Sequence, residues 1–282
     1  MQKLEVYQSR WAMELRQPNT RERSDEEAFA MVAETGFSGM CLDLGASNID
    51  AARSCLPLFK KYNLGCMINA FPKSIQDLQP VLKMAQDANA SYVNIIGQVM
   101  PFTVEEGVDV IKQWISMANR EKVPILFETH RNCITNDLFY TLQLMNILPE
   151  MPICADLSHY VVDREFSFPL NSQDQALIRQ ILKRADSFQG RVATREQIQI
   201  QINFPQHRKW VDQFFSWWKE GFQFWQNRHG PNDSLIFLTE LGPPEYAITG
   251  PDGYELSDRW EESLQIKKSV EEIWESCYTT SD

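Results

Sequence analysis

The chain has 282 residues, a formal net charge of −11 at pH 7 and a pI of about 5.0. A strongly acidic protein repels nucleic-acid phosphates and anionic lipids, which argues against nucleic-acid and membrane partners. Apolar residues make up 43% of the chain and charged residues 23%, the usual balance of a soluble protein with a sizeable core.

The sequence has none of the features of a membrane span or a signal peptide. Its first ten residues are mostly polar, and no apolar run approaches the roughly 18 residues that a membrane span needs. The six cysteines form no C-x-x-C pair, and several lie inside apolar runs, so we expect reduced, buried thiols. These features predict a cytoplasmic protein.

Short apolar runs, many with β-branched residues, alternate with longer segments of helical periodicity. The predicted strands span residues 7–15, 38–44, 65–71, 92–97, 124–129, 153–159, 187–192 and 235–241. Helices are predicted between them. One begins near Ser24 with an acidic first turn, and another begins at Thr103, where Glu106 completes the pattern of a capping box.

Eight strand–helix units in about 280 residues match the size of a (β/α)₈ barrel. An open, doubly wound sheet would show the same alternation, but it usually has a Gly-rich turn after its first strand, and residues 11–20 contain no glycine. We therefore predict an α/β fold, a single-domain TIM barrel over residues 1–282. Residues 204–226 form a predicted helix whose tryptophans pack in the core, and His207 and His229 are predicted to lie on the surface.

Four successive predicted strands end in side chains with oxygen atoms. In chain order they are Glu128, Asp156, Gln189 and Glu240. TIM-barrel active sites lie at the carboxyl ends of the strands, so we expect these side chains to converge. Clustered carboxylates repel one another where the dielectric constant is low, and a divalent cation removes that repulsion. An oxygen-only set favours Mn²⁺ or Mg²⁺, with Zn²⁺ as the alternative.

Each of these four residues also has a purely structural interpretation. Glu128 could cap the next helix or pair with Arg131, and Asp156 could form an Asx turn at its strand end. Glu240 could be a loop carboxylate, and Gln189 could be a strand side chain with satisfied hydrogen bonds. Four such residues on consecutive strand ends favour one shared site over four separate explanations.

Five further residues are candidates for substrate binding. His130 and His159 follow the fifth and sixth predicted strands and could bond a substrate or relay a proton. Arg191 is expected to point inward and Arg195 to follow in the loop, where either could hold hydroxyl or phosphate oxygens. Trp11, in the first predicted strand, is a candidate pocket wall. The structural alternatives are loop histidines with satisfied hydrogen bonds and ion pairs at an acidic rim.

The segments FETHRN, ADLSHYVV, GRVATREQIQI and LTELGPPEY resemble the sugar phosphate isomerase/epimerase group of the xylose-isomerase-like TIM barrels. The likeness is strongest over residues 123–262, and E-T-H-R followed by A-D-L-S-H is its most specific part.

The resemblance implies a divalent metal held by Glu128, Asp156, Glu240 and the residue at position 189. It also implies that the two glutamates form the acid/base pair and that His159 and an arginine hold the substrate. Members of the group usually carry histidine where this chain has Gln189. An amide oxygen can still bind a cation, so we expect metal binding with a shifted preference.

The favoured hypothesis is a metal-dependent isomerase or epimerase of a small keto or aldo sugar, phosphorylated or not, which works through an enediolate. Two alternatives stay open: a dehydratase of a keto-polyol on the same site, and a non-catalytic binding barrel whose metal site is eroded at Gln189. An apurinic-site endonuclease is argued against, because its trinuclear zinc site needs several histidines. This chain has only four, and none lies in the second, third or fourth predicted strand. The sequence leaves the oligomeric state open, with a homodimer as one candidate.

Overall fold

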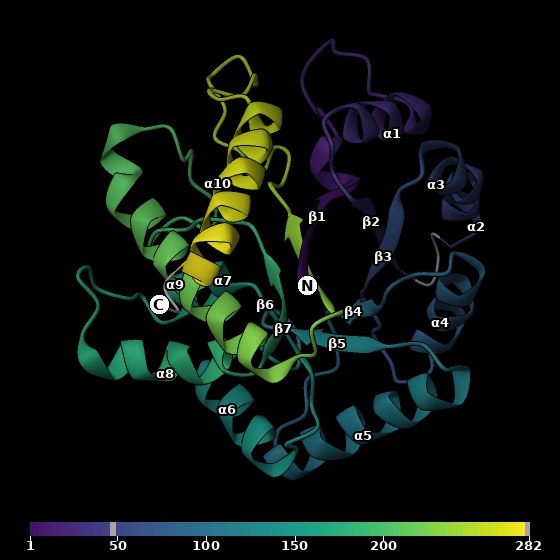
Figure 1. Cartoon of the computed structure of the whole chain (residues 1–282), viewed down its shortest axis with the longest axis vertical. Helices are drawn as coiled ribbons and strands as arrows, with labels where there is room; N and C mark the ends of the chain where they lie inside the picture. The colour runs from purple at the N-terminus through teal and green to yellow at the C-terminus, as the bar shows by residue number, and fades with distance from the viewer. Residues whose placement is uncertain (46–48, 280–282) are drawn as a thin grey trace.

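The computed structural model describes residues 1–45 and 49–279, in which eight parallel strands form a closed barrel with helices around it (Figure 1). The strands pair in chain order and the last pairs with the first. They are β1 (Lys3–Ser9), β2 (Gly39–Leu44), β3 (Gly65–Ala70), β4 (Val93–Ile95), β5 (Ile125–Glu128), β6 (Ile153–Ala155), β7 (Ala185–Gln189) and β8 (Ser234–Thr239). The predicted (β/α)₈ barrel is confirmed.

The helices in the described ranges form the outer layer (Figure 1). They are α1 (Asp25–Glu34), α2 (Ile49–Ala52), α3 (Leu56–Tyr62), α4 (Leu78–Asp87), α5 (Val104–Glu121), α6 (Leu138–Ile147), α7 (Leu157–Asp163), α8 (Ser172–Leu182), α9 (Arg208–Arg228) and α10 (Arg259–Thr279). The 3₁₀ turns are η1 (Trp11–Met13), η3 (Arg53–Cys55) and η4 (Pro205–His207). Ser24 caps α1 and Thr103 caps α5, as predicted. Both helices begin with a capping box, of which the one at Thr103 was predicted.

Three predicted strands extend at least three residues past the observed ones. The seventh ends at residue 189 rather than 192, and the other two are too long for an identifiable local reason. The first strand covers residues 3–9 rather than 7–15, because Ser9 Oγ accepts the Ala12 N–H at 3.2 Å and the chain turns into η1. The sixth strand ends at residue 155, where Asp156 becomes the N-cap of α7. Both predicted strands therefore included the start of the following turn or helix.

The interior of the barrel has an apolar floor. Its residues are Tyr7, Cys41, Met67, Tyr92, Leu126, Cys154, Ile236 and Leu238. The hydroxyls of Tyr92 and Ser187 lie 2.6 Å apart within it. The Tyr7 side chain needs glycine on two neighbouring strands, because a Cβ at Gly39 would lie 2.4 Å from its ring and a Cβ at Gly65 would lie 2.0 Å from its hydroxyl oxygen. The floor closes one end of the barrel and leaves the other end for polar groups.

The long aromatic helix α9 packs on the outside of the barrel. Its tryptophans 210, 217, 218 and 225 are buried, as predicted. His207 is also buried, with its Nδ1 2.7 Å from the Gln201 carbonyl oxygen, so its prediction as a surface residue is wrong. His229 is half-buried and stacks on Trp225.

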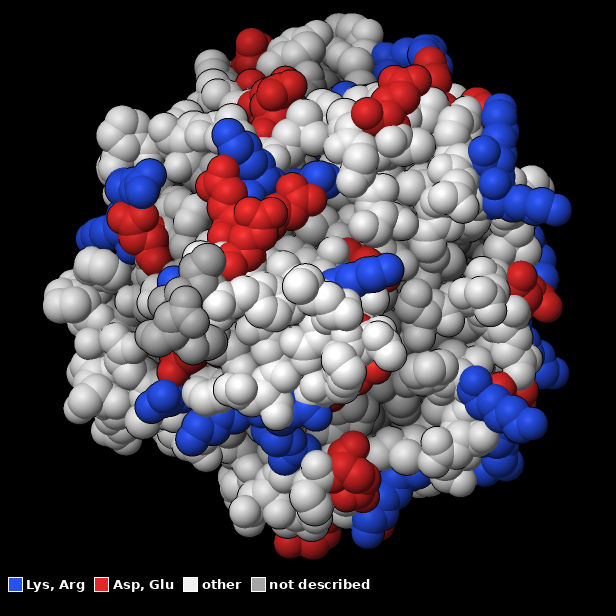
Figure 2. All heavy atoms as spheres, in the orientation of Figure 1, with Lys and Arg blue, Asp and Glu red and all other residues white. Residues whose placement is uncertain are grey.

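All six cysteines are buried and lie outside any disulfide bond among the described residues, as expected. Within residues 1–45 and 49–279, none of the helices has the length and apolar character needed to cross a membrane. Acidic and basic side chains are interspersed over the face shown in Figure 2.

Candidate metal and active site

A ring of polar side chains lies above the apolar floor, within one residue of the end of every strand. The ring residues are Ser9, Asp43, Asn69, Asn94, Glu128, Asp156, Gln189 and Glu240. In seven of the eight strands the residue two positions earlier belongs to the floor, and in β7 it is Ser187, which bonds to the floor. Side chains two residues apart on a strand share a face, so each strand places one side chain in the floor and the next in the ring.

The first four strands contribute mainly neutral groups to the ring. Register brings Asp43, Asn69 and Asn94 level with one another on β2, β3 and β4. Asn94 Nδ2 donates to Asn69 Oδ1 at 2.9 Å, and Asn69 Nδ2 donates to Asp43 Oδ1 at 3.0 Å. Asn69 Nδ2 also reaches Glu240 Oε1 at 3.1 Å, so the neutral half of the ring is bonded to the acidic half.

The last four strands bring three carboxyl groups together. Glu128, Asp156 and Glu240 each offer an oxygen, and the three oxygens lie within 4.8 Å of one another. All three side chains are buried, with at most 5% of any residue exposed. The convergence expected from the strand ends is therefore present in the structure.

Glu128 is held by amide groups. Its Oε2 accepts N–H bonds from Gln189 Nε2 at 2.9 Å and from Asn94 Nδ2. The other atoms of these amides, Gln189 Oε1 and Asn94 Oδ1, are buried and have no hydrogen-bond partner among the described residues. Burial, followed by repulsion from Glu240 and Asp156, raises the pKa of Glu128 well above its usual value.

Glu240 is the carboxyl group of this cluster that lies on the cavity wall. Its Oε2 accepts a bond from Arg191 Nη2 at 2.7 Å, in addition to the bond from Asn69. Burial raises the pKa of Glu240 to about 8, although the Arg191 charge acts in the opposite direction. This carboxyl group can therefore hold or release a proton near neutral pH.

Asp156 begins α7, where its Oδ1 accepts the Ser158 backbone N–H at 2.9 Å. Its Oδ2 lies 3.4 Å from His159 Nε2 and 3.3 Å from Arg191 Nη1. Burial opposes ionisation, but the interactions with His159 and Arg191 outweigh it and lower the pKa of Asp156. The cluster therefore contains one carboxylate that stays ionised beside two that gain protons easily.

Arg191 is a buried cation between two of the carboxylates. It bonds Asp156 and Glu240 as described, and its Nε donates to the Glu240 carbonyl oxygen at 3.1 Å. The Tyr246 ring lies 5.0 Å from this guanidinium and 5.3 Å from that of Arg131, which also donates to the tyrosine hydroxyl. Tyr246 is thus held between two arginines at the mouth of the site.

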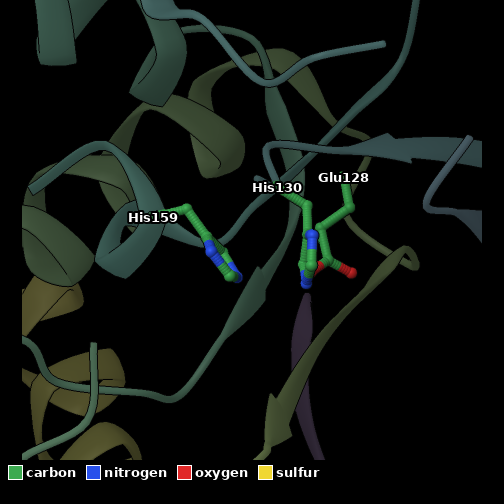
Figure 3. Close-up of side chains that lie close together, drawn as sticks. All are labelled: Glu128, His130 and His159. Carbon is green, nitrogen blue, oxygen red and sulfur yellow. The ribbon is translucent and has the colours of Figure 1, made fainter. Parts of the chain in front are cut away.

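Two histidines lie close to Glu128 (Figure 3). The ring centroids of His130 and His159 are 3.8 Å apart, and each offers a nitrogen within 4.8 Å of a Glu128 oxygen. Burial lowers the pKa of both, and their proximity lowers that of His130 further. Both imidazoles are therefore neutral at physiological pH.

A cavity of about 910 Å³ opens beside the cluster. Trp11, His130, Arg191, Glu240 and Tyr246 line it, so Trp11 forms part of a wall although it lies in η1 and not in a strand. Trp11 meets the Tyr246 ring edge-on, with centroids 5.3 Å apart. Tyr246, in the GPPEY segment, therefore lies at the mouth of the cavity.

Arg195 is not brought to this cavity. Its guanidinium pairs with Glu165 at 3.2 Å and with Glu196 at 2.7 Å, which is the structural alternative given for it. The chain has left β7 by residue 190, so strand alternation no longer determines where Arg195 points.

Sequence reasoning missed Asp43, Asn69 and Asn94. Each is a polar residue inside an apolar run, two positions after a floor residue: C-L-D, M-I-N and Y-V-N. The predicted ligands follow the same spacing, L-F-E, C-A-D and L-T-E. This shared spacing was the signal that could have revealed them.

No family model matches the chain, and no curated protein matches it in sequence. Solved structures do match. An L-ribulose 3-epimerase aligns with a TM-score of 0.64 and 12% identity over 99% of this chain and 97% of its own. A xylose isomerase-like TIM barrel protein from Mycobacterium smegmatis, in complex with magnesium, aligns with a TM-score of 0.59 and 10% identity. The alignment covers 96% of this chain and 98% of that protein.

A third solved structure is the probable 3-DHS dehydratase AsbF from Bacillus anthracis. It aligns with a TM-score of 0.59 and 14% identity over 94% of this chain and 99% of its own. These likenesses show that the chain shares the (β/α)₈ barrel fold of these proteins, which is the fold that the sequence resemblance implied. At 10–14% identity they establish the fold, and the chemistry has to be argued from the site.

Proposed function

We propose that this protein is a divalent-cation-dependent isomerase or epimerase of a small keto or aldo sugar or sugar phosphate. The observation that carries the proposal is the placement of Glu128, Asp156 and Glu240 on three strands, with oxygens within 4.8 Å of one another beside an open cavity. The fold shared with an L-ribulose 3-epimerase supports it.

The residues fit a cation. Three buried carboxyl groups at this separation repel one another, and the Gln189 Oε1 atom is buried without a partner among the described residues. Four oxygen donors suit Mg²⁺ or Mn²⁺ better than a softer metal. A bound divalent cation would polarise the substrate carbonyl and stabilise the negative charge of an enediolate.

The two glutamates would move the proton. Glu240 faces the cavity, and its pKa of about 8 allows it to exchange a proton with a sugar carbon near neutral pH. Glu128, held by two amides, would serve as its partner on the other side of the substrate. Arg191 and His159 would hold substrate hydroxyls.

A dehydratase is the second candidate, because the same fold occurs in the probable 3-DHS dehydratase from Bacillus anthracis. Removal of the substrate proton by Glu240 would then be followed by loss of a β-hydroxyl group from the substrate. A non-catalytic binding barrel is the third, and Arg191 favours it, since this side chain already places one positive charge between two of the three carboxylates.

The test is proton exchange. The protein, supplied with Mg²⁺ or Mn²⁺, is incubated with a panel of ketoses in D₂O and followed by NMR. We expect deuterium at a carbon next to the carbonyl, and its loss in Glu240→Gln but not in the exposed Glu150→Gln control. Loss of water from the substrate would instead establish the dehydratase. Retained exchange in Glu240→Gln would contradict the proposed role of this residue.

A further inference from the structure

Glu128 belongs to a second group of metal-binding side chains, formed with His130 and His159 (Figure 3). One ligand atom from each lies within 4.8 Å of the others, and the three come from the end of β5, the loop that follows it, and α7. This nitrogen-containing group differs in donor chemistry from the all-oxygen group that Glu128 shares with Asp156 and Glu240.

The tautomer of His130 suits a metal ligand. Its Nδ1 lies 2.5 Å from the Arg131 carbonyl oxygen. A carbonyl oxygen can only accept, so Nδ1 carries the hydrogen and Nε2 keeps its lone pair. Histidines that bind metals typically donate their second nitrogen to a backbone carbonyl in this way, which fixes the orientation of the ring.

His159 is a second imidazole with bonding capacity to spare. Its Nε2 lies 3.4 Å from Asp156 Oδ2 and 3.4 Å from Arg191 Nη1. Its Nδ1 is buried and has no hydrogen-bond partner in the part of the chain that the structure describes. An unpaired buried polar atom is costly, which favours a role outside the protein's own hydrogen bonds.

Glu128 also lacks the positive partner that the other two carboxylates have. Arg191 bonds Asp156 and Glu240, whereas the partners of the Glu128 side chain within the described ranges are the amides of Asn94 and Gln189. A cation beside the two histidines would neutralise this remaining acid.

We propose that Glu128, His130 and His159 form a second cation subsite, which takes a borderline divalent metal such as Zn²⁺ or Co²⁺. Two imidazoles and a carboxylate are a typical donor set for these metals and leave a fourth position open to a small molecule. Glu128 would lie between the two cations. This subsite goes beyond the proposed function, because it adds a second metal and does not require sugar chemistry.

The test is stoichiometry. Metal-free protein is dialysed against buffered Zn²⁺, and zinc per chain is measured by mass spectrometry. We expect two equivalents in the wild type and in the His229→Asn control, and one equivalent in His130→Asn and in His159→Asn. The proposal would be overturned if the wild type bound one zinc per chain and His130→Asn still bound that one. It would also be overturned if His130→Asn bound two zinc ions per chain.

Two further measurements separate this proposal from the function proposed above. Asp156→Asn should lose the all-oxygen site and keep the zinc bound by the histidines, so a failure of either site can be recognised independently. X-ray absorption of the wild type with one equivalent of Co²⁺ needs no variant, and it should show outer-shell scattering from imidazole. A spectrum with oxygen scattering alone would overturn the subsite.

Discussion

The floor and the ring of the barrel are built from the same strands, one side-chain step apart, yet they have opposite character. Floor residues such as Met67 and Leu126 are apolar and closely packed, whereas the ring residues two positions later, Asn69 and Glu128, are polar and bonded to one another. The floor contributes burial energy, and the ring keeps ionisable groups at high free energy. Stability and chemistry are thus separated along each strand by about 7 Å of chain.

The largest expected effect is a loss of catalytic rate when the ring residue Glu240 is changed. Glu240→Gln keeps the shape of the side chain and removes its proton exchange, so kcat should fall roughly 10²–10⁴-fold. Steady-state kinetics and a urea melt of the same variant provide the check. The fold should persist, since the buried carboxyl group destabilises the protein when ionised.

Arg191→Met should have the second-largest effect, a loss of stability. It leaves Asp156 and Glu240 without their buried cation, and breaking such a pair costs about 3–5 kcal/mol of unfolding free energy. Added Mg²⁺ should recover part of the loss, because the cation replaces the missing charge. Arg195→Met is the matched control. Because its ion pair with Glu165 is more exposed, its loss should lower the free energy of unfolding by less than about 1 kcal/mol. Equal losses in both variants would contradict the bridging role.

A paired substitution tests the separation of floor and ring directly. Leu126→Ala in the floor should cost roughly 2–5 kcal/mol of stability with little change in kcat per folded molecule. Asn94→Leu in the ring should lower kcat about 10–100-fold with a smaller loss of stability, because Glu128 loses a donor. Chemical denaturation and kinetics on both variants would show whether the two layers are as separate as the structure indicates.

Without added cations, stability should depend on pH. The folded-state pKa values of Glu240, about 8, and of Glu128 are raised above the ordinary carboxyl value of 4.5, so the folded protein binds more protons than the unfolded chain. The lowered pKa values of His130 and His159 act in the opposite direction below about pH 7, so the free energy of unfolding should fall as pH rises from about 7 to about 8. Denaturation at several pH values in a chelator measures the slope, and Glu240→Gln should flatten it.

The smallest expected change concerns position 189. Gln189→His replaces an amide oxygen by an imidazole nitrogen, which should tighten Zn²⁺ binding about tenfold relative to Mg²⁺. Competition with a coloured chelator, in the His130→Asn background, restricts the measurement to the all-oxygen site. An unchanged preference would indicate that residue 189 does not contact the cation.

Alternation and strand ends were sufficient to predict the barrel and the convergence of Glu128, Asp156, Gln189 and Glu240, because both follow from the spacing of apolar and polar residues along each strand. The extent of β1 was missed because Ala12 and Met13 are buried in a 3₁₀ turn and look like strand residues in the sequence.

Other features depend on contacts between distant segments. Asn69 and Asn94 gain a role only once the register places β2, β3 and β4 level with one another. The position of Tyr246 depends on two arginines and Trp11, all far from it in sequence. Interactions of this kind are set by the assembled barrel, and no local pattern contains them.

The apolar floor determines how small molecules reach the site. Packed side chains close the floor end of the barrel, so substrate and product must both pass through the cavity mouth, beside Trp11 and Tyr246. A departing product therefore obstructs the next arrival. We expect product inhibition to be competitive with respect to substrate.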